Sequence, residues 1–205
     1  MVAVIDYGVG NLFSLVSSLN AIGAEAVVTS DAEVIKKADR IILPGVGAFE
    51  DAAKKLSING LDKLIISLAE EGKPILGICL GMQLLFERSM EYGVHKGLGL
   101  IKGDVLGFDG KISDKLKIPH IGWNRLELTQ PNCPLWKYIK NGDYVYFVHS
   151  YFAEISDATA SKSEYGVEFT AAVCNKNIYG CQFHPEKSGD VGLNILRGFC
   201  EEGGV

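Results

Sequence analysis

The sequence has no long apolar run and no cluster of basic residues. Its longest apolar stretches are far shorter than the roughly 20 residues that cross a bilayer, so no membrane partner is expected. The net charge is -5, with 25 acidic and 20 basic residues and no run of lysine or arginine. Nucleic acid and anionic membrane surfaces are therefore poor candidates for binding partners.

Cysteine is scarce and scattered. The odd number of cysteines, five in 205 residues, argues against a disulfide framework. Neither a Cys-x-x-Cys nor a His-Glu-x-x-His pattern occurs, so no metal site is predicted. The segment 1–5 reads as a first strand, without the basic region and cleavage site of a signal peptide. A reducing, cytoplasmic location fits these features best.

The order of the elements predicts an α/β fold. Hydrophobic residues make up 47% of the chain, which suffices for the core of a single domain spanning residues 1–205. The first 90 residues alternate between strand and helix patterns, which predicts a parallel sheet flanked by helices on both faces. The expected strands here are 2–5, 26–29, 40–43 and 75–78, and the expected helices are 11–22, a short one opening at 30–33, 48–57 and 61–71.

After about residue 100 the pattern changes to strands separated by turns, followed by a closing helix at about 189–200. This pattern predicts an antiparallel extension of an open mixed sheet. The expected strands are 105–108, 124–128, 144–148, 169–175 and 178–183.

The most specific motif is Gly77-Ile78-Cys79-Leu80-Gly81, where a short apolar strand meets a helix-like pattern that continues through Phe86. Hydrolases use Gly-x-Ser-x-Gly in the same position to raise a nucleophile above a sheet edge. The first N–H groups of the following helix would favour a thiolate at Cys79. A lone cysteine is more often a small buried hydrophobic residue, so this interpretation needs a base nearby.

The segment His184-Pro185-Glu186 follows a predicted strand and supplies such a base. A residue before proline favours extended backbone, and residues two apart in an extended chain share a face. A carboxylate beside an imidazole holds the tautomer that a general base needs. Cys79, His184 and Glu186 therefore form a candidate nucleophile, base and orienting acid. His149 is a rival base, but its sequence neighbours include no acid to orient it.

Two glycine-rich loops, at 6–11 and 44–47, also follow strands at this edge of the sheet. Neither fits Gly-x-Gly-x-x-Gly, because Phe13 and Glu50 occupy the last position, so no nucleotide cofactor is predicted. Residues 45–47 could turn backbone N–H groups toward an oxyanion, or could form an ordinary turn. Trp123 lies beside a glycine before a strand, and both a core and a surface location stay open for it.

Taken together, residues 77–83 and His184-Pro185-Glu186 resemble the class I (triad) glutamine amidotransferases. Segments 6–12, 44–49, 119–124 and 184–188 are similar, in order along the whole chain, to the glutaminase subunits of imidazole glycerol phosphate synthases. The resemblance implies hydrolysis of L-glutamine to glutamate and ammonia, without a cofactor. It also implies a heterodimer in which ammonia passes to a (β/α)₈-barrel cyclase subunit in histidine biosynthesis.

The resemblance further implies a role for each matching residue. Cys79 would form a glutamyl thioester, His184 would transfer protons, and Glu186 would orient His184. The N–H of Leu80 and an N–H from the loop would form the oxyanion hole. The implied loop residues are Gly45, Val46 and Gly47, the implied substrate contacts are Gln83, Glu91, Ser150 and Tyr151, and the implied partner contacts are Asn11, Trp123 and Lys187.

Three alternatives stay open on the sequence alone. A paralogous glutaminase could supply ammonia for amination of surface sugars, or for pyridoxal phosphate synthesis, which the 120–124 segment disfavours. A hydrolase or redox-responsive protein could use the same turn around Cys79, although Gln83 argues against it. A binding module with a buried Cys79 would have no chemical reason to keep both His184 and Glu186.

Overall fold

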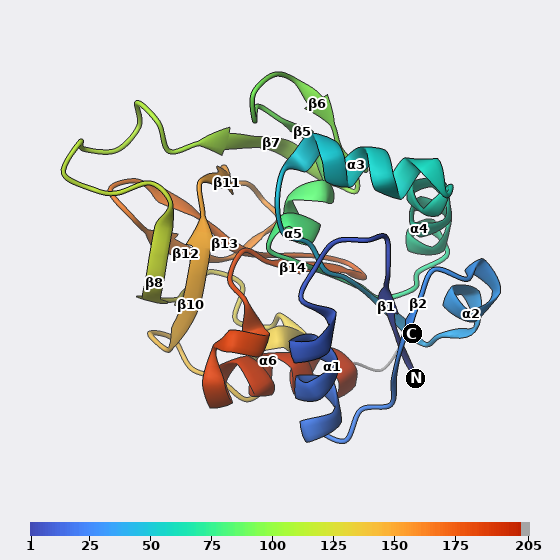
Figure 1. Cartoon of the computed structure of the whole chain (residues 1–205). Helices are drawn as coiled ribbons and strands as arrows, with labels where there is room; N and C mark the ends of the chain where they lie inside the picture. Colours follow the sequence, from blue (N-terminus) through green and yellow to red (C-terminus); the bar gives the residue numbers. More distant parts are fainter. Residues whose placement is uncertain (202–205) are drawn as a thin grey trace.

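Four short parallel strands from the first half of the chain form the centre of the fold in the computed structural model, which describes residues 1–201. A fifth parallel strand, β14, joins them from the far end of the chain and lies beside β4. The order β2-β1-β3-β4-β14 thus brings the two ends of the sequence into one sheet (Figure 1). These strands are β1 (Val2–Ile5), β2 (Ala26–Thr29), β3 (Arg40–Leu43), β4 (Ile75–Ile78) and β14 (Ile178–Cys181).

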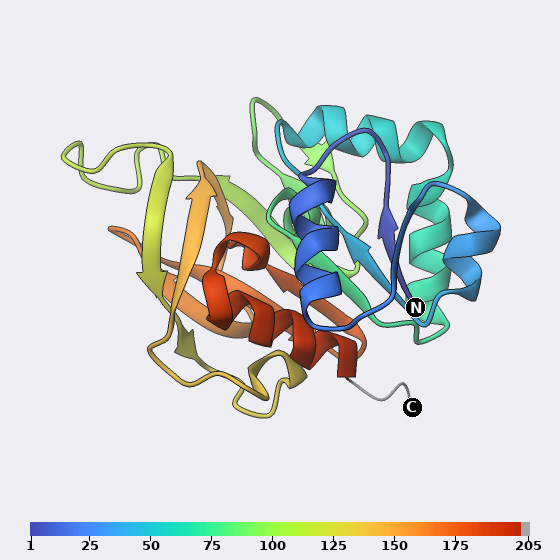
Figure 2. The same cartoon turned by 60° about the horizontal axis from the view of Figure 1, so that its bottom comes forward.

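Helices cover both faces of this parallel part (Figures 1 and 2). Alternate residues of β1 belong to two different clusters: Val2 and Val4 pack with α1 and α6, whereas Ala3 and Ile5 pack with the helices of the opposite face. This is the alternation of a strand buried on both sides. The helices are α1 (Leu12–Ala21) and α6 (Gly189–Glu201) on one face, and α2 (Ala32–Lys37), α3 (Phe49–Ile58), α4 (Leu61–Glu70) and α5 (Leu80–Leu84) on the other.

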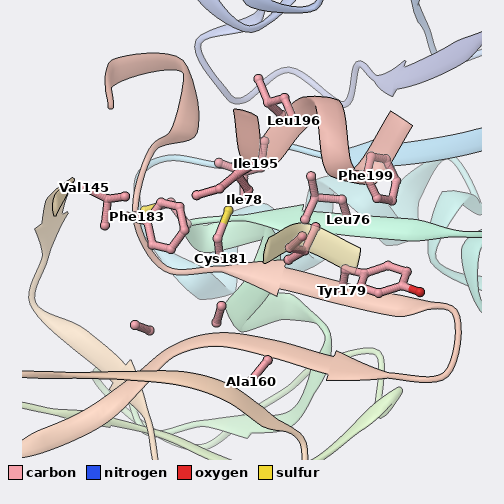
Figure 3. Packing of buried hydrophobic residues seen from close by; sticks show 14 of the residues in the cluster. Leu76, Ile78, Val145, Ala160, Tyr179, Cys181, Phe183, Ile195, Leu196 and Phe199 are labelled. Carbon is pink, nitrogen blue, oxygen red and sulfur yellow. The ribbon is translucent and has the colours of Figure 1, made fainter. Parts of the chain in front are cut away.

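The last helix, α6, packs against the centre of the sheet. Figure 3 shows Ile195, Leu196 and Phe199 of α6 against Leu76 of β4 and Tyr179 of β14. These side chains are between 0% and 2% exposed, and burying an aliphatic or phenyl side chain of this size contributes about 1.5–3 kcal/mol. The helix therefore holds together the two strands whose ends carry the candidate site.

The second half of the chain extends the sheet beyond β14, largely with antiparallel pairs. The sheet continues in the order β13-β11-β7-β5-β6, while a separate hairpin-like pair, β8 and β10, stands beside it (Figure 1). The remaining strands are β5 (Phe86–Ser89), β6 (His95–Lys96), β7 (Ile101–Gly107), β8 (His120–Arg125), β9 (Glu127–Leu128), β10 (Tyr144–His149), β11 (Tyr151–Ala153), β12 (Thr159–Glu164) and β13 (Glu168–Asn175). Short 3₁₀ helices span Pro134–Trp136 and Pro185–Lys187.

The predicted fold class, an open mixed sheet with helices on both faces, is confirmed, and several boundaries are corrected. The helix after Cys79 ends at Leu84 instead of continuing through Phe86, because Phe86 begins β5. The predicted strand 124–128 is two strands, β8 and β9, and strands β5, β6, β11 and β12 were not predicted. The short helix predicted to open at 30–33 is α2, capped by Asp31, whose carboxylate accepts from the N–H of Glu33 at 2.7 Å. None of the described helices is both long and apolar enough to cross a membrane.

Candidate active site

The turn after β4 holds Cys79 in a backbone conformation that few side chains adopt. Its φ of 53° and ψ of -111° lie outside the regions that non-glycine residues favour. The flanking glycines allow the turn: a Cβ at Gly77 would lie 2.6 Å from Met82 Cα, and a Cβ at Gly81 would lie 1.8 Å from the carbonyl oxygen of Leu43. The backbone therefore closes tightly on both sides of Cys79 and fixes its height above the sheet.

His184 and Glu186 lie at the end of the neighbouring strand β14. The Nδ1 of His184 is 2.8 Å from Oε1 of Glu186, and their side chains are each 4% exposed. The predicted pairing is present, but the predicted extended backbone is wrong for Glu186. Only His184 is extended, and Glu186 lies in the 3₁₀ turn Pro185–Lys187, which brings its carboxylate back to the ring. Because a carboxylate accepts a hydrogen bond, Nδ1 carries the proton and Nε2 is left for the thiol side.

The surroundings of His184 favour its protonated form. Burial opposes the charge on the imidazole, but hydrogen bonds and charge from Cys79 and Glu186 outweigh burial and raise the pKa of His184 to about 10. Cys79 is thus one of the two groups that favour the charged ring. This arrangement suits a thiolate–imidazolium pair, the nucleophile form of a cysteine.

Cys79 and His184 line a pocket of about 730 Å³. Most of the other sequence-predicted residues line it too, namely Val46, Gly47, Leu80, Gln83, Glu91, Ser150, Tyr151 and Lys187. Gly45 is not among the pocket-lining residues. A Cβ on Gly45 would lie 2.8 Å from the backbone nitrogen of Gly81. Glu186 lies behind His184 rather than on the pocket surface. Asn11 and Trp123 are not among the pocket-lining residues.

The two polar residues predicted to bind substrate already make contacts within the protein. The Nε2 of Gln83 donates to the carbonyl oxygen of Tyr151 at 2.9 Å and to Oε1 of Gln182 at 3.0 Å. Oε2 of Glu91 accepts from the N–H of Phe49, the first residue of α3, at 2.5 Å. Substrate contact would therefore fall to Oε1 of Gln83 and to the other oxygen of Glu91.

His149, the rival base, also lines the pocket but is held in the neutral form. Its Nδ1 donates to the Tyr151 carbonyl oxygen at 2.9 Å, and its Nε2 therefore accepts from Nδ1 of His120 at 3.0 Å. Burial is the main cause that lowers the pKa of His149 to about 3 and that of His120 to about 4. With both ring nitrogens engaged, His149 is less suited than His184 to take up a proton.

The three predicted partner contacts are all exposed at the surface. Asn11 is exposed and caps α1 by accepting from the N–H of Ser14 at 3.4 Å. Trp123 is 56% exposed on β8, which decides between the core and surface interpretations. The Nζ of Lys187 lies 6.0 Å from the ring centroid of Tyr146, which in turn contacts Trp123.

Two residues near Cys79 were missed by sequence reasoning. Gln182 is fully buried with its Nε2 3.7 Å from Sγ of Cys79. Its position two residues before His184, at the end of a strand, was a usable signal because such residues share a face. Tyr7 is buried beside Gly45 and donates to the carbonyl oxygen of Pro44 at 2.7 Å, and no local pattern pointed to it.

Comparisons with known proteins show the family of the chain. The family model "Glutamine amidotransferase class-I" matches residues 3–202. Relatives named "Imidazole glycerol phosphate synthase subunit HisH" include one from Caldanaerobacter subterraneus, 50% identical with 98% of each chain covered. Another, from Sulfurimonas denitrificans, is 50% identical with 97% of each chain covered. A solved structure of PurLQS from Thermotoga maritima shares the fold, with a TM-score of 0.73 at 22% identity over 97% of this chain and 96% of that one.

Proposed function

The chain belongs to the class I glutamine amidotransferases, and we propose that it is the glutaminase subunit of an imidazole glycerol phosphate synthase. The observation that carries the chemistry is that Cys79 and His184 line one pocket large enough for an amino acid, with the buried Glu186 bonded to His184. The observation that favours this synthase over other members is the name shared by relatives that are 45–50% identical over nearly the whole chain.

The reaction follows from the arrangement of the triad. Sγ of Cys79 attacks the side-chain carboxamide carbon of L-glutamine, and the C–N bond breaks as His184 gives its proton to the departing ammonia. A thioester to Cys79 remains. His184, now neutral, takes a proton from water, which attacks the thioester and releases glutamate, while the proton on His184 restores the starting pair. Glu186 keeps Nδ1 protonated throughout, so that Nε2 faces the reacting atoms.

A carboxamide is a poor electrophile, so the oxygen that becomes negative needs donors. We propose the backbone N–H of Leu80, next to the nucleophile, and an N–H from the 45–47 loop as these donors, and the lining of the pocket by Leu80, Val46 and Gly47 supports the proposal. Gly45 keeps that loop close to the turn, because any side chain there would strike Gly81. Removing one such donor typically costs about 100- to 1,000-fold in rate.

The remaining pocket residues would hold the amino-acid part of glutamine. The carboxylate of Glu91 is suited to an ammonium group, and the backbone at Ser150 and Tyr151 offers main-chain contacts along the pocket wall. Gln83 supplies its oxygen, because its nitrogen is occupied by Tyr151 and Gln182.

Ammonia released in open water would be protonated and lost, so a dry path into a partner is needed. We infer a heterodimer with the cyclase subunit, docked over the surface that holds Asn11, Trp123 and Lys187. Exposed aromatic residues are enriched in such interfaces, and Phe13 of α1, close to Asn11 in the chain, is 85% exposed. We propose a cytoplasmic location, which the odd number of scattered cysteines in the sequence supports.

The test measures glutamate release from glutamine by the full chain mixed with a cyclase subunit and its nucleotide ligand. We expect Cys79→Ala to abolish release, because no thioester can form, whereas Cys174→Ala on β13 keeps it. Undiminished release by Cys79→Ala would refute the nucleophile, and no stimulation of the parent chain by the cyclase would refute the choice of partner.

A further inference from the structure

Gln182 faces the nucleophile but takes no part in the proton transfers of the triad. It follows the last residue of β14 and is fully buried. Its Nε2 lies 3.7 Å from Sγ of Cys79, within the range of an N–H···S hydrogen bond. A buried amide is costly unless both of its ends are satisfied, so the contacts of Gln182 decide what it can do.

The contacts of the Gln83 amide allow the side-chain amide of Gln182 only one orientation. The carbonyl oxygen of Tyr151 can only accept, so the Gln83 amide turns its NH₂ group toward it, at 2.9 Å. The other N–H of that group donates to Gln182 at 3.0 Å, which requires Oε1 of Gln182 at that position. The NH₂ group of Gln182 must then point to Cys79. A single main-chain oxygen thus determines that Gln182 presents a donor, and not an acceptor, to the sulfur. The sulfur also lies 4.0 Å from the carbonyl oxygen of Val148, to which only a protonated thiol could donate.

Main-chain hydrogen bonds also hold Gln182 and Cys79 near each other. The N–H of Gln182 donates to the carbonyl oxygen of Ala171 on β13 at 2.8 Å, and the N–H of Cys79 donates to that of Cys181 at 2.7 Å. Cys79 is therefore bonded to the residue that directly precedes Gln182 in the chain. Neither backbone can shift without breaking a bond at a strand end.

Other titratable groups near the sulfur are not placed to donate to it as Gln182 does. The hydroxyl of Tyr7, from the loop after β1, already donates to Pro44, and burial and the charge of Cys79 raise the pKa of Tyr7. The thiol of Cys181 on β14 contacts the carbonyl oxygen of Gly77 at 3.9 Å, and burial, followed by Glu186 and Cys79, raises its pKa. His184 is the exception, because it exchanges a proton with the sulfur in the proposed reaction.

We propose that Gln182 is a catalytic residue that donates its amide N–H to the Cys79 thiolate and so holds the nucleophile ionised and aimed between His184 and the substrate. A neutral thiol is a weak acceptor, whereas a hydrogen bond to an ionised group is roughly twice as strong as a neutral one. The contact therefore strengthens as the proton leaves the sulfur. The inference rests on the proposed glutaminase function for its purpose, but its physical content concerns Cys79 alone.

The experiment follows the rate of Cys79 alkylation by iodoacetamide against pH in the full chain without glutamine, with the modified peptide identified by mass spectrometry. Gln182→Met removes the donor and keeps an unbranched side chain of similar length. We expect the pH midpoint of alkylation to rise by about one unit, the size expected when a charged group loses one hydrogen bond. Gln130→Met is the matched control, because Gln130 also donates to a main-chain carbonyl oxygen, that of Asp157, away from the pocket; its midpoint should equal that of the parent.

A second variant protects the test against misfolding. Gln83→Met leaves Gln182 in place but removes the group that orients it, so the midpoint should move in the same direction by a smaller amount. Thermal unfolding of each variant reports the structural cost separately. A lowered melting temperature with an unchanged midpoint in both variants would show that Gln182 only fills space, and would overturn the proposal.

Turnover with the cyclase subunit then separates this inference from the proposed function. We expect Gln182→Met to lower kcat about tenfold near neutral pH and to leave KM for glutamine unchanged, with part of the loss recovered at higher pH. If the parent chain shows no glutaminase activity but the midpoint shift is present, the proposed function fails and the role of Gln182 stands. If the parent chain is active but Gln182→Met shifts neither the midpoint nor kcat, the role of Gln182 fails and the proposed function stands.

Discussion

His184 and His149 line the same pocket, are similarly buried at 3% and 6% exposure, and have pKa values displaced in opposite directions. Each ring donates from Nδ1, His184 to the carboxylate of Glu186 and His149 to the carbonyl oxygen of Tyr151. Burial alone would lower both pKa values. The difference lies in the partners, because an acid and a thiol surround His184 while a carbonyl and a neutral imidazole surround His149.

The two histidines therefore suit different roles on the two sides of the pocket that they line. The His184 side can hold and move a proton, which acyl transfer needs. The His149 side keeps one tautomer and no charge, which suits it to hold the wall formed by Ser150 and Tyr151. The contrast also explains why a histidine without an acid nearby in the sequence was the weaker candidate base.

The largest effect should come from removing the acid beside His184, which makes its surroundings resemble those of His149. Glu186→Gln replaces the carboxylate by an amide, which can no longer hold Nδ1–H with a charge. We expect glutamate release in the presence of the cyclase to fall by roughly 10³- to 10⁴-fold, as when a triad acid becomes an amide. The pKa of His184 should fall from about 10 toward its ordinary value in an NMR titration. Exposed Glu164→Gln is the control, and a pKa that stays raised in Glu186→Gln would break the comparison.

The second effect is on stability in mild acid. The pKa values of His120 and His149 are lowered to about 4 and about 3, so below pH 6.5 the unfolded chain binds protons that the folded chain refuses. Stability should therefore fall as pH drops from 6.5 toward 4, by about 1.4 kcal/mol per pH unit for each histidine. The raised pKa of His184 acts in the opposite window: its contribution is complete below about 6.5 and is lost as pH rises toward 10, so it adds no slope in acid.

Urea unfolding of His149→Leu between pH 4 and 6.5 measures this slope. We expect a shallower slope than in the parent chain, together with lower stability at neutral pH. His95→Leu is the matched control, because His95 lies on the β5–β6 hairpin 3.8 Å from the carboxylate of Glu50 and away from the pair. Equal slopes in His149→Leu and the parent chain would contradict the assignment of a neutral histidine pair.

The smallest effect should come from the surface residue Lys187, which lies near Tyr146 and Trp123. Lys187 follows the triad acid, and its ammonium lies over Tyr146, which contacts Trp123 on the strand that also carries His120. We expect Lys187→Ala to weaken stimulation by the cyclase several-fold while stability changes by less than about 1 kcal/mol, the size of an exposed cation–π contact. Lys63→Ala, exposed on α4, is the control. Stimulation equal to that of the parent would remove Lys187 from the interface.

The sequence made the triad side of the pocket predictable because its signals are local. The glycines around Cys79 and the spacing of His184 and Glu186 can each be seen within a few residues. The His120–His149 pair depends on the register of β8 against β10, which places residues 29 apart opposite each other. The orientation of Gln182 depends on Gln83, 99 residues away. Distant pairing of this kind leaves no local pattern to read.

The missed strands have a similar cause. Strand β12 has the sequence Thr-Ala-Ser-Lys-Ser-Glu, which lacks the alternation of apolar residues that marks a strand. It is held by its neighbours β13 and β9, with its serines and its threonine turned inward. Strand propensity depends on such neighbours more than on the segment itself, so the sequence of β12 alone could not identify it.

The carbonyl oxygen of Tyr151 has a consequence for how this protein can vary. It accepts from both Gln83 and His149, yet it belongs to the main chain, and any amino acid at position 151 would supply it. Substitutions at position 151 can therefore leave both of these hydrogen bonds in place. An insertion or deletion between β10 and β11 would instead move the oxygen itself and disconnect the amide pair and the histidine pair in one event. For these hydrogen bonds the number of residues between β10 and β11 matters, and the identity of the amino acid at position 151 does not.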